Sequence, residues 1–236
     1  MAEFIFGKNT VSAYLKNGTA PKKLYLFNKG NYSEIVAMAK DMNVNYQFVE
    51  KHKLDKLVNG VHQGVVAEIA DYKYATLEDV MKRESKLIVL CDQLEDPHNL
   101  GAILRTVDAV NADGVIVGKH RGVGLTDTVA KVSTGAIHSV PVVQVTNLVK
   151  TLETLKDAGY WVVAAENGVN AVSYTDFNAD MPIVLVVGSE GKGISRLVRE
   201  ASDILVTIPM EGTVNSLNVS VATGILLYDI TRRRKG

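Results

Sequence analysis

The chain has little cysteine and no long apolar run, and each shortage excludes a class of protein. Cys91 is the single cysteine among 236 residues, so no disulfide can form within the chain. It lies in the apolar run 87–91, which predicts a thiol buried in a strand. No apolar run reaches the ~18 residues that span a bilayer, and residues 1–18 lack the pattern of a secretory leader. We therefore expect a soluble, cytoplasmic protein.

An excess of charge of either sign is also missing. Lysine and arginine number 26 and so do aspartate and glutamate, which leaves no global field to attract a polyanion. Three local basic clusters remain. Each is open to two interpretations, a phosphate contact or a solvated loop or helix end, and only its position around a site can decide. The clusters are Lys22-Lys23, Lys119-His120-Arg121 and Arg232-Arg233-Arg234-Lys235.

Several catalytic and binding signatures are absent as well. The five histidines form no i, i+3 or i, i+4 pair and have no partnering cysteines, so we expect no metal site. No G-x-S-x-G elbow is present to hold a nucleophilic serine. The glycines at 188, 191 and 193 have the spacing G-x-x-G-x-G, which fits neither a dinucleotide-binding fingerprint nor a P-loop.

Apolar periodicity divides the chain into two α/β regions joined by a polar linker. Residues 1–72 alternate short strands and helices, which predicts a compact α/β module. Residues 73–85 are polar, with Thr76 and Asp79 spaced as a helix cap. Residues 86–236 carry near-continuous Val/Ile/Leu runs, which are typical of strands covered on both faces and predict a mostly parallel sheet. The runs are residues 87–91, 114–117, 140–145, 161–165, 183–187 and 204–208.

Three segments combine a glycine or proline turn with a polar cluster, and each follows or overlaps the end of an apolar run. They are residues 96–106 (DPHNLGAILRT), 187–193 (VGSEGKG) and 208–220 (IPMEGTVNSLNVS). Open α/β sheets bind ligands at the carboxyl ends of their strands, so we expect the three segments to meet there.

Each segment also has a purely structural interpretation. Asn99 is placed to cap the helix that carries Arg105. Glu190 suits a hydroxyl, an amide or a cation better than a phosphate, or it caps a helix that starts near Ser195. Asn218 is placed to cap the last helix and need do nothing more.

Together the three segments resemble the SpoU/TrmH family of RNA ribose 2′-O-methyltransferases, within the SPOUT superfamily. The resemblance covers roughly residues 86–234 and rests on D-P-x-N-x-G-A-x-x-R-T, G-S-E-G-x-G and I-P-M-x-G-x-V-x-S-L-N-V-S, present in that order. The amino-terminal module, from Ile5-Phe6-Gly7 to His62-Gln63-Gly64, resembles the L30e-like substrate-binding domain of the RlmB-type 23S rRNA guanosine 2′-O-methyltransferases.

The resemblance implies more than periodicity can. It implies S-adenosylmethionine as the methyl donor, large-subunit rRNA as the partner, a trefoil knot near the carboxyl end and a homodimer whose active site joins two subunits. The apolar pattern alone predicts an ordinary unknotted sheet, because knots are nearly absent from protein folds.

Carried over by motif position, the resemblance implies two groups of site residues. Those that contact the cofactor are Gly188, Ile208, Met210 and Leu217. Those that surround the reacting ribose are Asn99, Arg105, Glu190, Ser216 and Asn218. A guanidinium stays protonated in proteins, so Arg105 is a poor base. We hypothesise that Arg105, supplied by the partner subunit, holds a phosphate and stabilises negative charge while the neighbouring polar side chains orient the hydroxyl.

Three alternatives remain open at this point. A tRNA 2′-O-methyltransferase would carry the same three segments. A non-catalytic rRNA-binding or ribosome-assembly factor would keep the fold, but the intact Arg105 and the complete Ser216-Leu217-Asn218 loop argue against it. A nicotinamide-dependent oxidoreductase is disfavoured by the order of the glycines.

Overall fold

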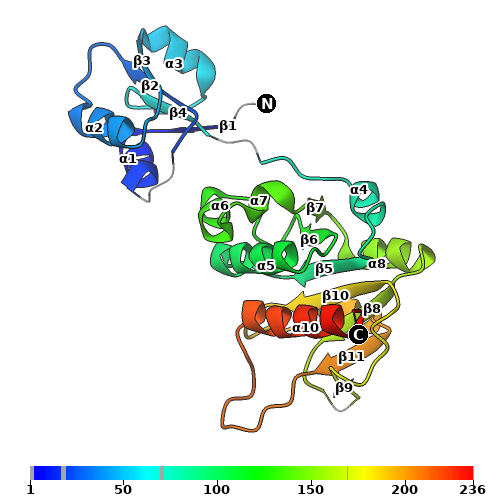
Figure 1. Cartoon of the computed structure of the whole chain (residues 1–236). Coiled ribbons are helices and arrows are strands. Elements are labelled where there is room, and N and C mark those ends of the chain that lie inside the picture. The colour runs from blue at the N-terminus through cyan, green and yellow to red at the C-terminus, as the bar shows by residue number, and fades with distance from the viewer. Residues whose placement is uncertain (1–2, 17–19, 70–71, 169, 236) are drawn as a thin grey trace. The chain divides into compact units, whose positions relative to one another are not determined.

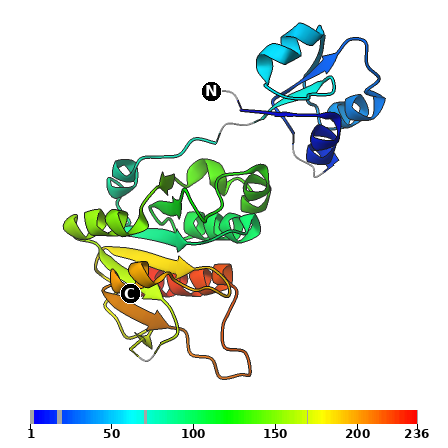
Figure 2. The same cartoon turned by 180° about the vertical axis from the view of Figure 1, so that it is seen from behind.

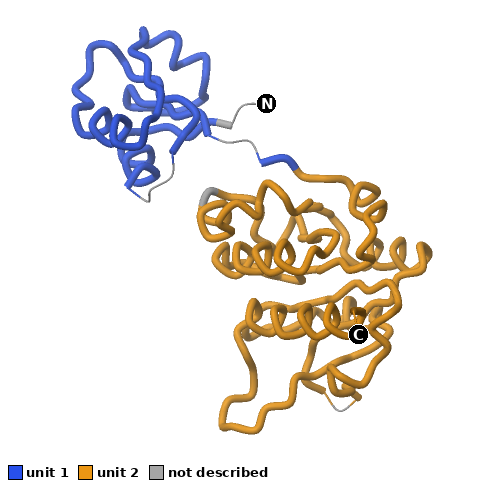
Figure 3. The backbone as a smooth tube through the Cα atoms, viewed as in Figure 1, with its two compact units in different colours: residues 1–73 blue, residues 74–236 orange. Residues whose placement is uncertain are grey.

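The chain folds into two compact units, residues 1–73 and 74–236 (Figure 3). The computed structural model describes residues 3–16, 20–69, 72–168 and 170–235. The polar stretch 73–85 contains the short helix α4 (Leu77–Met81), which belongs to the second unit. Thr76 and Asp79 form the reciprocal capping box that their spacing predicts.

The first unit is a four-stranded sheet with helices on both faces. The sheet order is β1-β4-β2-β3, with β4 antiparallel to β1 and β2 and with β3 parallel to β2. Side chains of α1 and α2 pack on one face, and Leu54 of α3 packs on the other. The bounds are β1 Glu3–Phe6, α1 Lys8–Lys16, β2 Lys23–Phe27, α2 Ser33–Asp41, β3 Tyr46–Val49, α3 Lys51–Leu57 and β4 Val65–Ile69.

The second unit is built on a seven-stranded sheet in the order β7-β6-β5-β10-β8-β11-β9 (Figure 1). All its strand pairs are parallel, which confirms the predicted mostly parallel α/β sheet. The strands are β5 Leu87–Asp92, β6 Gly114–Gly118, β7 Val142–Val145, β8 Trp161–Ala165, β9 Val172–Ser173, β10 Ile183–Gly188 and β11 Ile204–Thr207.

Helices cover both faces of this sheet, as its near-continuous apolar strands require. Buried side chains of α4, α8 and α9 share one core with the sheet. On the other face α5 contacts α6, α7 and α10, and Figure 2 shows the same layers from behind. The helices are α5 Pro97–Ala109, α6 Asp127–Ser133, α7 Ala136–Ser139, α8 Leu148–Asp157, α9 Arg196–Glu200 and α10 Val219–Arg233.

The predicted thiol in β5 is buried. Cys91 is 2% exposed, and burial, assisted by the charge of Asp92, raises the pKa of its thiol to about 12. The thiolate is therefore scarce at neutral pH, and Cys91 serves as a small apolar side chain in the sheet.

The carboxyl-terminal arginines anchor the last helix at the edge of the sheet where β5 and β10 begin. Arg234 donates four hydrogen bonds to carbonyl oxygens, those of Ala179, Ser85, Lys86 and Met181. Arg233 donates to the carbonyls of Tyr174, Thr175 and Phe177, and its guanidinium lies 4.6 Å from the Phe177 ring centroid. Neither interpretation of this basic cluster holds for these two residues, because both are half-buried and bound to the backbone.

Candidate active site

The first polar segment leaves β5 and enters α5. The carboxylate of Asp96 accepts the backbone N–H of His98 at 2.9 Å, so Asp96 is the cap of α5 and Pro97 is its first residue. The prediction that Asn99 caps this helix is wrong. Proline lacks an N–H and has a helical φ, so it favours the first helical position and places the cap directly before it. Asn99 is therefore the third residue of the helix, and it is buried.

The second segment forms a closed backbone turn at the end of β10. Ser189 and Gly193 exchange backbone hydrogen bonds of 3.2 and 2.9 Å, which brings the chain back across Gly188. A Cβ at Gly188 would lie 2.3 Å from the carbonyl carbon of Gly193, so no larger residue fits. Gly191 has a φ of +84°, a left-handed conformation that favours glycine. Glu190 stands in this turn, exposed.

Side chains from all three segments meet in one hydrogen-bonded cluster. A carboxylate oxygen of Glu190 accepts the Nδ2 of Asn99 at 3.2 Å and also the Nδ2 of Asn218. That same Asn218 amide donates to the Oδ1 of Asn99 at 3.0 Å. Residues 91 to 119 positions apart are thus in direct contact, as expected of segments that leave the carboxyl ends of parallel strands in one sheet.

The cluster decides between the two interpretations of Glu190 and Asn218. Glu190 does not cap α9, because the N–H of Ser195 donates to the buried carboxylate of Asp92 at 2.7 Å. Asn218 does cap α10, since its Oδ1 accepts the N–H of Ser220 at 2.9 Å. Its amide group simultaneously belongs to the cluster, so it has both roles.

A cavity of about 580 Å³ opens beside this cluster. Its walls come from the ends of β8, β10 and β11 and from the long loop between β11 and α10, visible in orange in Figure 1. All four residues predicted to contact the cofactor line it, and so do three of those predicted around the ribose. These residues are Gly188, Ile208, Met210, Leu217, Glu190, Ser216 and Asn218.

Sequence reasoning missed the wall that follows β8. Glu166 and Asn167 line the cavity. Asn167 accepts the Thr207 hydroxyl at 2.5 Å and donates to the carbonyl of Asn215 at 2.8 Å, while Glu166 forms an ion pair of 2.5 Å with Arg199. The signal was available, because two polar residues directly follow the apolar run 161–165 in the same way as the other segments follow theirs.

Arg105 is the one predicted site residue that this chain does not bring to the cluster or the cavity. It lies six residues after Asn99 in α5, about 9 Å along the helix axis and on a different side of it. Its side chain is exposed, and among the described residues it makes no hydrogen bond or ion pair. The hypothesis that it acts in the site of a second subunit remains untested by this geometry.

The described part of the chain contains no group of three or more His, Cys, Asp or Glu arranged to hold a metal ion. None of its helices has both the length and the apolar character needed to cross a membrane.

The comparisons with known proteins match both units. The model of the SpoU rRNA methylase family matches residues 86–228, and the model described as RNA 2′-O ribose methyltransferase substrate binding matches residues 4–75. A Bacillus subtilis (strain 168) protein named as a TrmH family tRNA/rRNA methyltransferase is 47% identical over 98% of this chain and 96% of its own length.

Two solved structures share the fold. The AdoMet-bound rRNA methyltransferase of Sinorhizobium meliloti is 26% identical with a TM-score of 0.65 and covers 98% of this chain and 87% of its own. The A. aeolicus TrmH/SpoU tRNA modifying enzyme is 35% identical with a TM-score of 0.60, over 67% of this chain and 81% of its own.

The cavity fits S-adenosylmethionine, the ligand of the Sinorhizobium structure. Its volume falls within the usual range for small-molecule sites. Among the described residues, the charged side chains that line it are those of Glu166, which pairs with Arg199, and Glu190, whose carboxylate suits a sulfonium cation. The buried hydroxyl oxygen of Ser189, also in its wall, has no hydrogen-bond partner among the described residues and is available to a ligand. The chain belongs to the SpoU/TrmH family and is an S-adenosylmethionine-dependent RNA methyltransferase.

Proposed function

We propose that this enzyme methylates a ribose 2′-hydroxyl of large-subunit rRNA, with a guanosine as the target nucleoside. The observation that carries the proposal is the cluster of Asn99, Glu190 and Asn218 beside a cavity that fits the methyl donor. The cluster offers amide donors and a carboxylate acceptor to a hydroxyl. The match of residues 4–75 to a substrate-binding domain of RNA 2′-O ribose methyltransferases supports ribose as the acceptor.

The chemistry asks the protein to align and deprotonate a weak nucleophile. When bound, S-adenosylmethionine would supply an electrophilic methyl group whose carbon–sulfur bond breaks with its electron pair left on sulfur. The 2′-oxygen would form the new bond to that carbon, and the hydroxyl proton would pass through the Glu190 carboxylate to water. Glu190 and Ser216 hold the hydroxyl in line with the methyl group, and Asn99 and Asn218 fix the carboxylate of Glu190. Arg105 holds a neighbouring phosphate and stabilises the negative charge that develops on oxygen.

The choice of rRNA over tRNA rests on the amino-terminal unit. The Sinorhizobium rRNA methyltransferase aligns with 98% of this chain, whereas the A. aeolicus tRNA modifying enzyme aligns with 67%. A tRNA target is the alternative. An rRNA target also locates the reaction in the cytoplasm.

We further propose a homodimer in which each Arg105 serves the partner's site, and a trefoil knot in residues 183–220. The exposed position of Arg105, away from its own cavity, supports the first of these proposals. The second is supported by the order of the strands, because β10 lies between β5 and β8 while α10 returns along the same sheet.

The first test is mapping of the product. The purified enzyme is given methyl-labelled S-adenosylmethionine with deproteinised large-subunit rRNA or with bulk tRNA, and the RNA is digested to nucleosides. We expect label in 2′-O-methylguanosine from rRNA. Label on a base, or label only in tRNA, would refute the corresponding part of the proposal. A chain that binds no S-adenosylmethionine in calorimetry and labels no RNA would support the non-catalytic assembly factor.

The second test separates a shared site from a self-contained one. Arg105→Ala chains are mixed with Gly188→Val chains, which keep Arg105 but cannot close the turn of residues 189–193 that lines the cofactor cavity. If Arg105 acts across the dimer, mixed dimers contain one complete site, and the mixture recovers about a quarter of the wild-type rate. If Arg105 acts within its own chain, the mixture stays as inactive as each variant alone. Arg105→Lys then reports whether positive charge suffices.

A further inference from the structure

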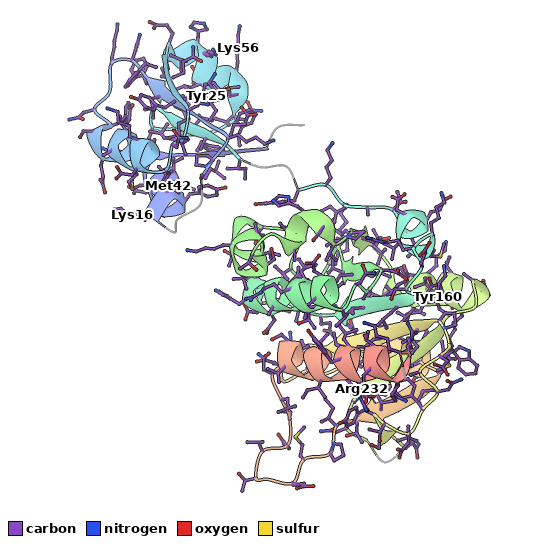
Figure 4. The ribbon with its side chains drawn as sticks, in the orientation of Figure 1. Lys16, Tyr25, Met42, Lys56, Tyr160 and Arg232 are labelled. Carbon is purple, nitrogen blue, oxygen red and sulfur yellow. The ribbon has the colours of Figure 1, made fainter. Side chains whose placement is uncertain are left out.

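One side of the amino-terminal unit carries four lysines that form no ion pair with a described residue. We call it the α3 surface: Lys23, Tyr25, Lys51, Lys53 and Lys56. The three lysines of α3 are exposed, and among the described residues none of the four lysines forms an ion pair. Figure 4 labels Tyr25 and Lys56, which lie on this side of the sheet.

Two of these lysines are held together by one aromatic ring. The Nζ of Lys23 lies 5.2 Å from the centroid of Tyr25 and the Nζ of Lys53 lies 5.8 Å from it. The Tyr25 hydroxyl donates to Glu68 at 3.1 Å, and burial, followed by this hydrogen bond, raises the pKa of Tyr25, which keeps the ring neutral. The ring thus fixes two like charges near each other, an arrangement that is stabilised when an anion approaches.

The acids of this side are engaged with other partners. Glu50 accepts the side-chain amide of Asn28 at 2.5 Å, Asp55 lies 2.9 Å from His62, and Glu68 accepts Tyr25. The side formed by α1 and α2 is different, because there Lys16 forms an ion pair of 2.8 Å with Glu34. These carboxylates keep their negative charge, so the α3 surface differs from the side of α1 and α2 in the arrangement of its lysines and not in net charge. None of its four lysines is ion-paired with a described residue, and two of them lie against one aromatic ring.

We propose that the α3 surface binds the phosphate backbone of the RNA substrate. This rests on the proposed function, since it assigns to particular residues the task of holding the RNA while the second unit methylates it. The partner is RNA because the unit matches a substrate-binding domain of RNA methyltransferases and because unpaired lysines complement phosphates. The geometry favours backbone contacts over base recognition, since lysine is a point charge that carries no base pattern.

The test compares two triple variants that remove equal charge from opposite sides. Lys23→Gln with Lys53→Gln and Lys56→Gln acts on the α3 surface, and Lys8→Gln with Lys16→Gln and Lys40→Gln is the control. Binding of the full chain to deproteinised large-subunit rRNA is measured over a salt series. We expect the first variant to bind roughly 10-fold more weakly, with the slope of log affinity against log salt reduced by about 2. The control should bind within about twofold of wild type, since its charges contact no phosphate.

Each other outcome contradicts the proposal. Equal losses in the two triple variants would mean that only net charge matters, and a larger loss in the control would place RNA on the other side. Competition by polyglutamate as strong as that by RNA would make the surface a site for an acidic protein. Tyr25→Leu keeps both lysines but frees them, so it should weaken binding about threefold, whereas Tyr25→Phe should not.

The same measurements distinguish this proposal from the proposed function. If wild type binds rRNA through the α3 surface and labels no ribose, the catalytic assignment fails and the surface remains. If wild type labels ribose and the α3 variant methylates rRNA with an unchanged KM and affinity, the surface assignment fails and the catalytic one remains.

Discussion

The two ends of α10 are held in opposite ways. At its start, Asn218 is exposed, and its amide binds Glu190 and Asn99 while its oxygen caps the helix. At its end, Arg233 and Arg234 are half-buried and donate to backbone carbonyls in residues 85–86 and 174–181. One helix therefore connects an accessible polar site to a rigid anchor near the opposite edge of the sheet.

The difference teaches that charge alone does not mark an RNA contact. The run Arg232-Arg233-Arg234-Lys235 is the densest basic cluster of the chain, yet Arg234 uses most of its N–H donors on carbonyl oxygens and has few left for a phosphate. The uncharged Asn218 belongs to the cluster beside the cavity. The lysines of α3, which no acid pairs, are better candidates for phosphate binding than the arginines.

The largest effect that we predict is a loss of stability when the anchor at the end of α10 is removed. Arg234→Ala removes four hydrogen bonds and leaves the carbonyls of Ala179, Ser85 and Met181 without their donor. The free energy of unfolding of the second unit should fall by about 3 kcal/mol, since donors to buried carbonyls are costly to lose. Denaturant titration followed by circular dichroism measures it.

Arg232→Ala is the matched control for this experiment. Arg232, labelled in Figure 4, belongs to the same cluster, but its side chain is 75% exposed and, among the described residues, forms an ion pair with Asp229 alone. We expect a change below about 0.5 kcal/mol, because Arg232 is exposed and the buried Asp229 keeps its ion pair with Arg233. If Arg234→Ala instead unfolded like wild type and lost affinity for rRNA, the anchor would be a phosphate site and the comparison would be reversed.

The strands, and the edge where the three segments meet, could be predicted from the sequence because burial on both faces demands apolar runs. The order of the strands could not. The sequence of β10 does not indicate that this strand pairs with β5 on one side and β8 on the other, since all three strands are apolar runs rich in Val, Ile and Leu. The role of Arg234 was hidden for a related reason: its partners are backbone carbonyls 53 to 149 residues away, which any residue type supplies.

Within the site, the contact of Asn99, Glu190 and Asn218 could be anticipated from their positions in the three segments. The cap of α5 was misassigned because a side chain at Asp96 and one at Asn99 are both good acceptors, and Pro97 decides between them. Arg105 could not be assigned from one chain, because the role we propose for it lies in another subunit and would leave no trace in its own cavity.

A second, smaller effect concerns the start of α10, where two variants separate the two roles of Asn218. Asn218→Ser keeps an oxygen that can cap α10 but loses the amide that donates to Glu190 and Asn99; Asn218→Ala loses both. We expect kcat to fall roughly 100-fold in both variants, while only alanine lowers stability, by about 1 kcal/mol. Methylation assays and unfolding curves measure the two quantities.

Ser220→Ala is the control, because Ser220 donates to the Oδ1 of Asn218 and does not contact the Nδ2 that binds Glu190 and Asn99. Its activity should stay within about threefold of wild type. Full activity of Asn218→Ser would show that the cap is the only function of this residue, and the two ends of α10 would then both be structural.

The smallest effect concerns a carboxyl at the anchored end. Asp113 is 2% exposed and accepts the N–H groups of Ser85 and Leu87 at 3.0 and 3.1 Å. Burial raises the pKa of Asp113, and the hydrogen bonds from the backbone oppose this only in part. Because the folded protein then binds the proton more tightly than the unfolded chain, this carboxyl costs stability above its folded pKa, and the cost disappears as the pH falls below the unfolded value.

Asp113→Asn removes the titration and keeps the shape, so the stability of wild type relative to this variant should rise as the pH is lowered from 7 toward 4. Unfolding curves at each pH measure the difference. If wild type instead loses stability relative to the variant as the pH falls, the hydrogen bonds from the backbone N–H groups outweigh the effect of burial and lower the pKa of Asp113. The edge that binds Arg234 would then favour charged groups in general. We expect instead that it accepts a guanidinium because its carbonyls satisfy nearly every N–H donor of that group.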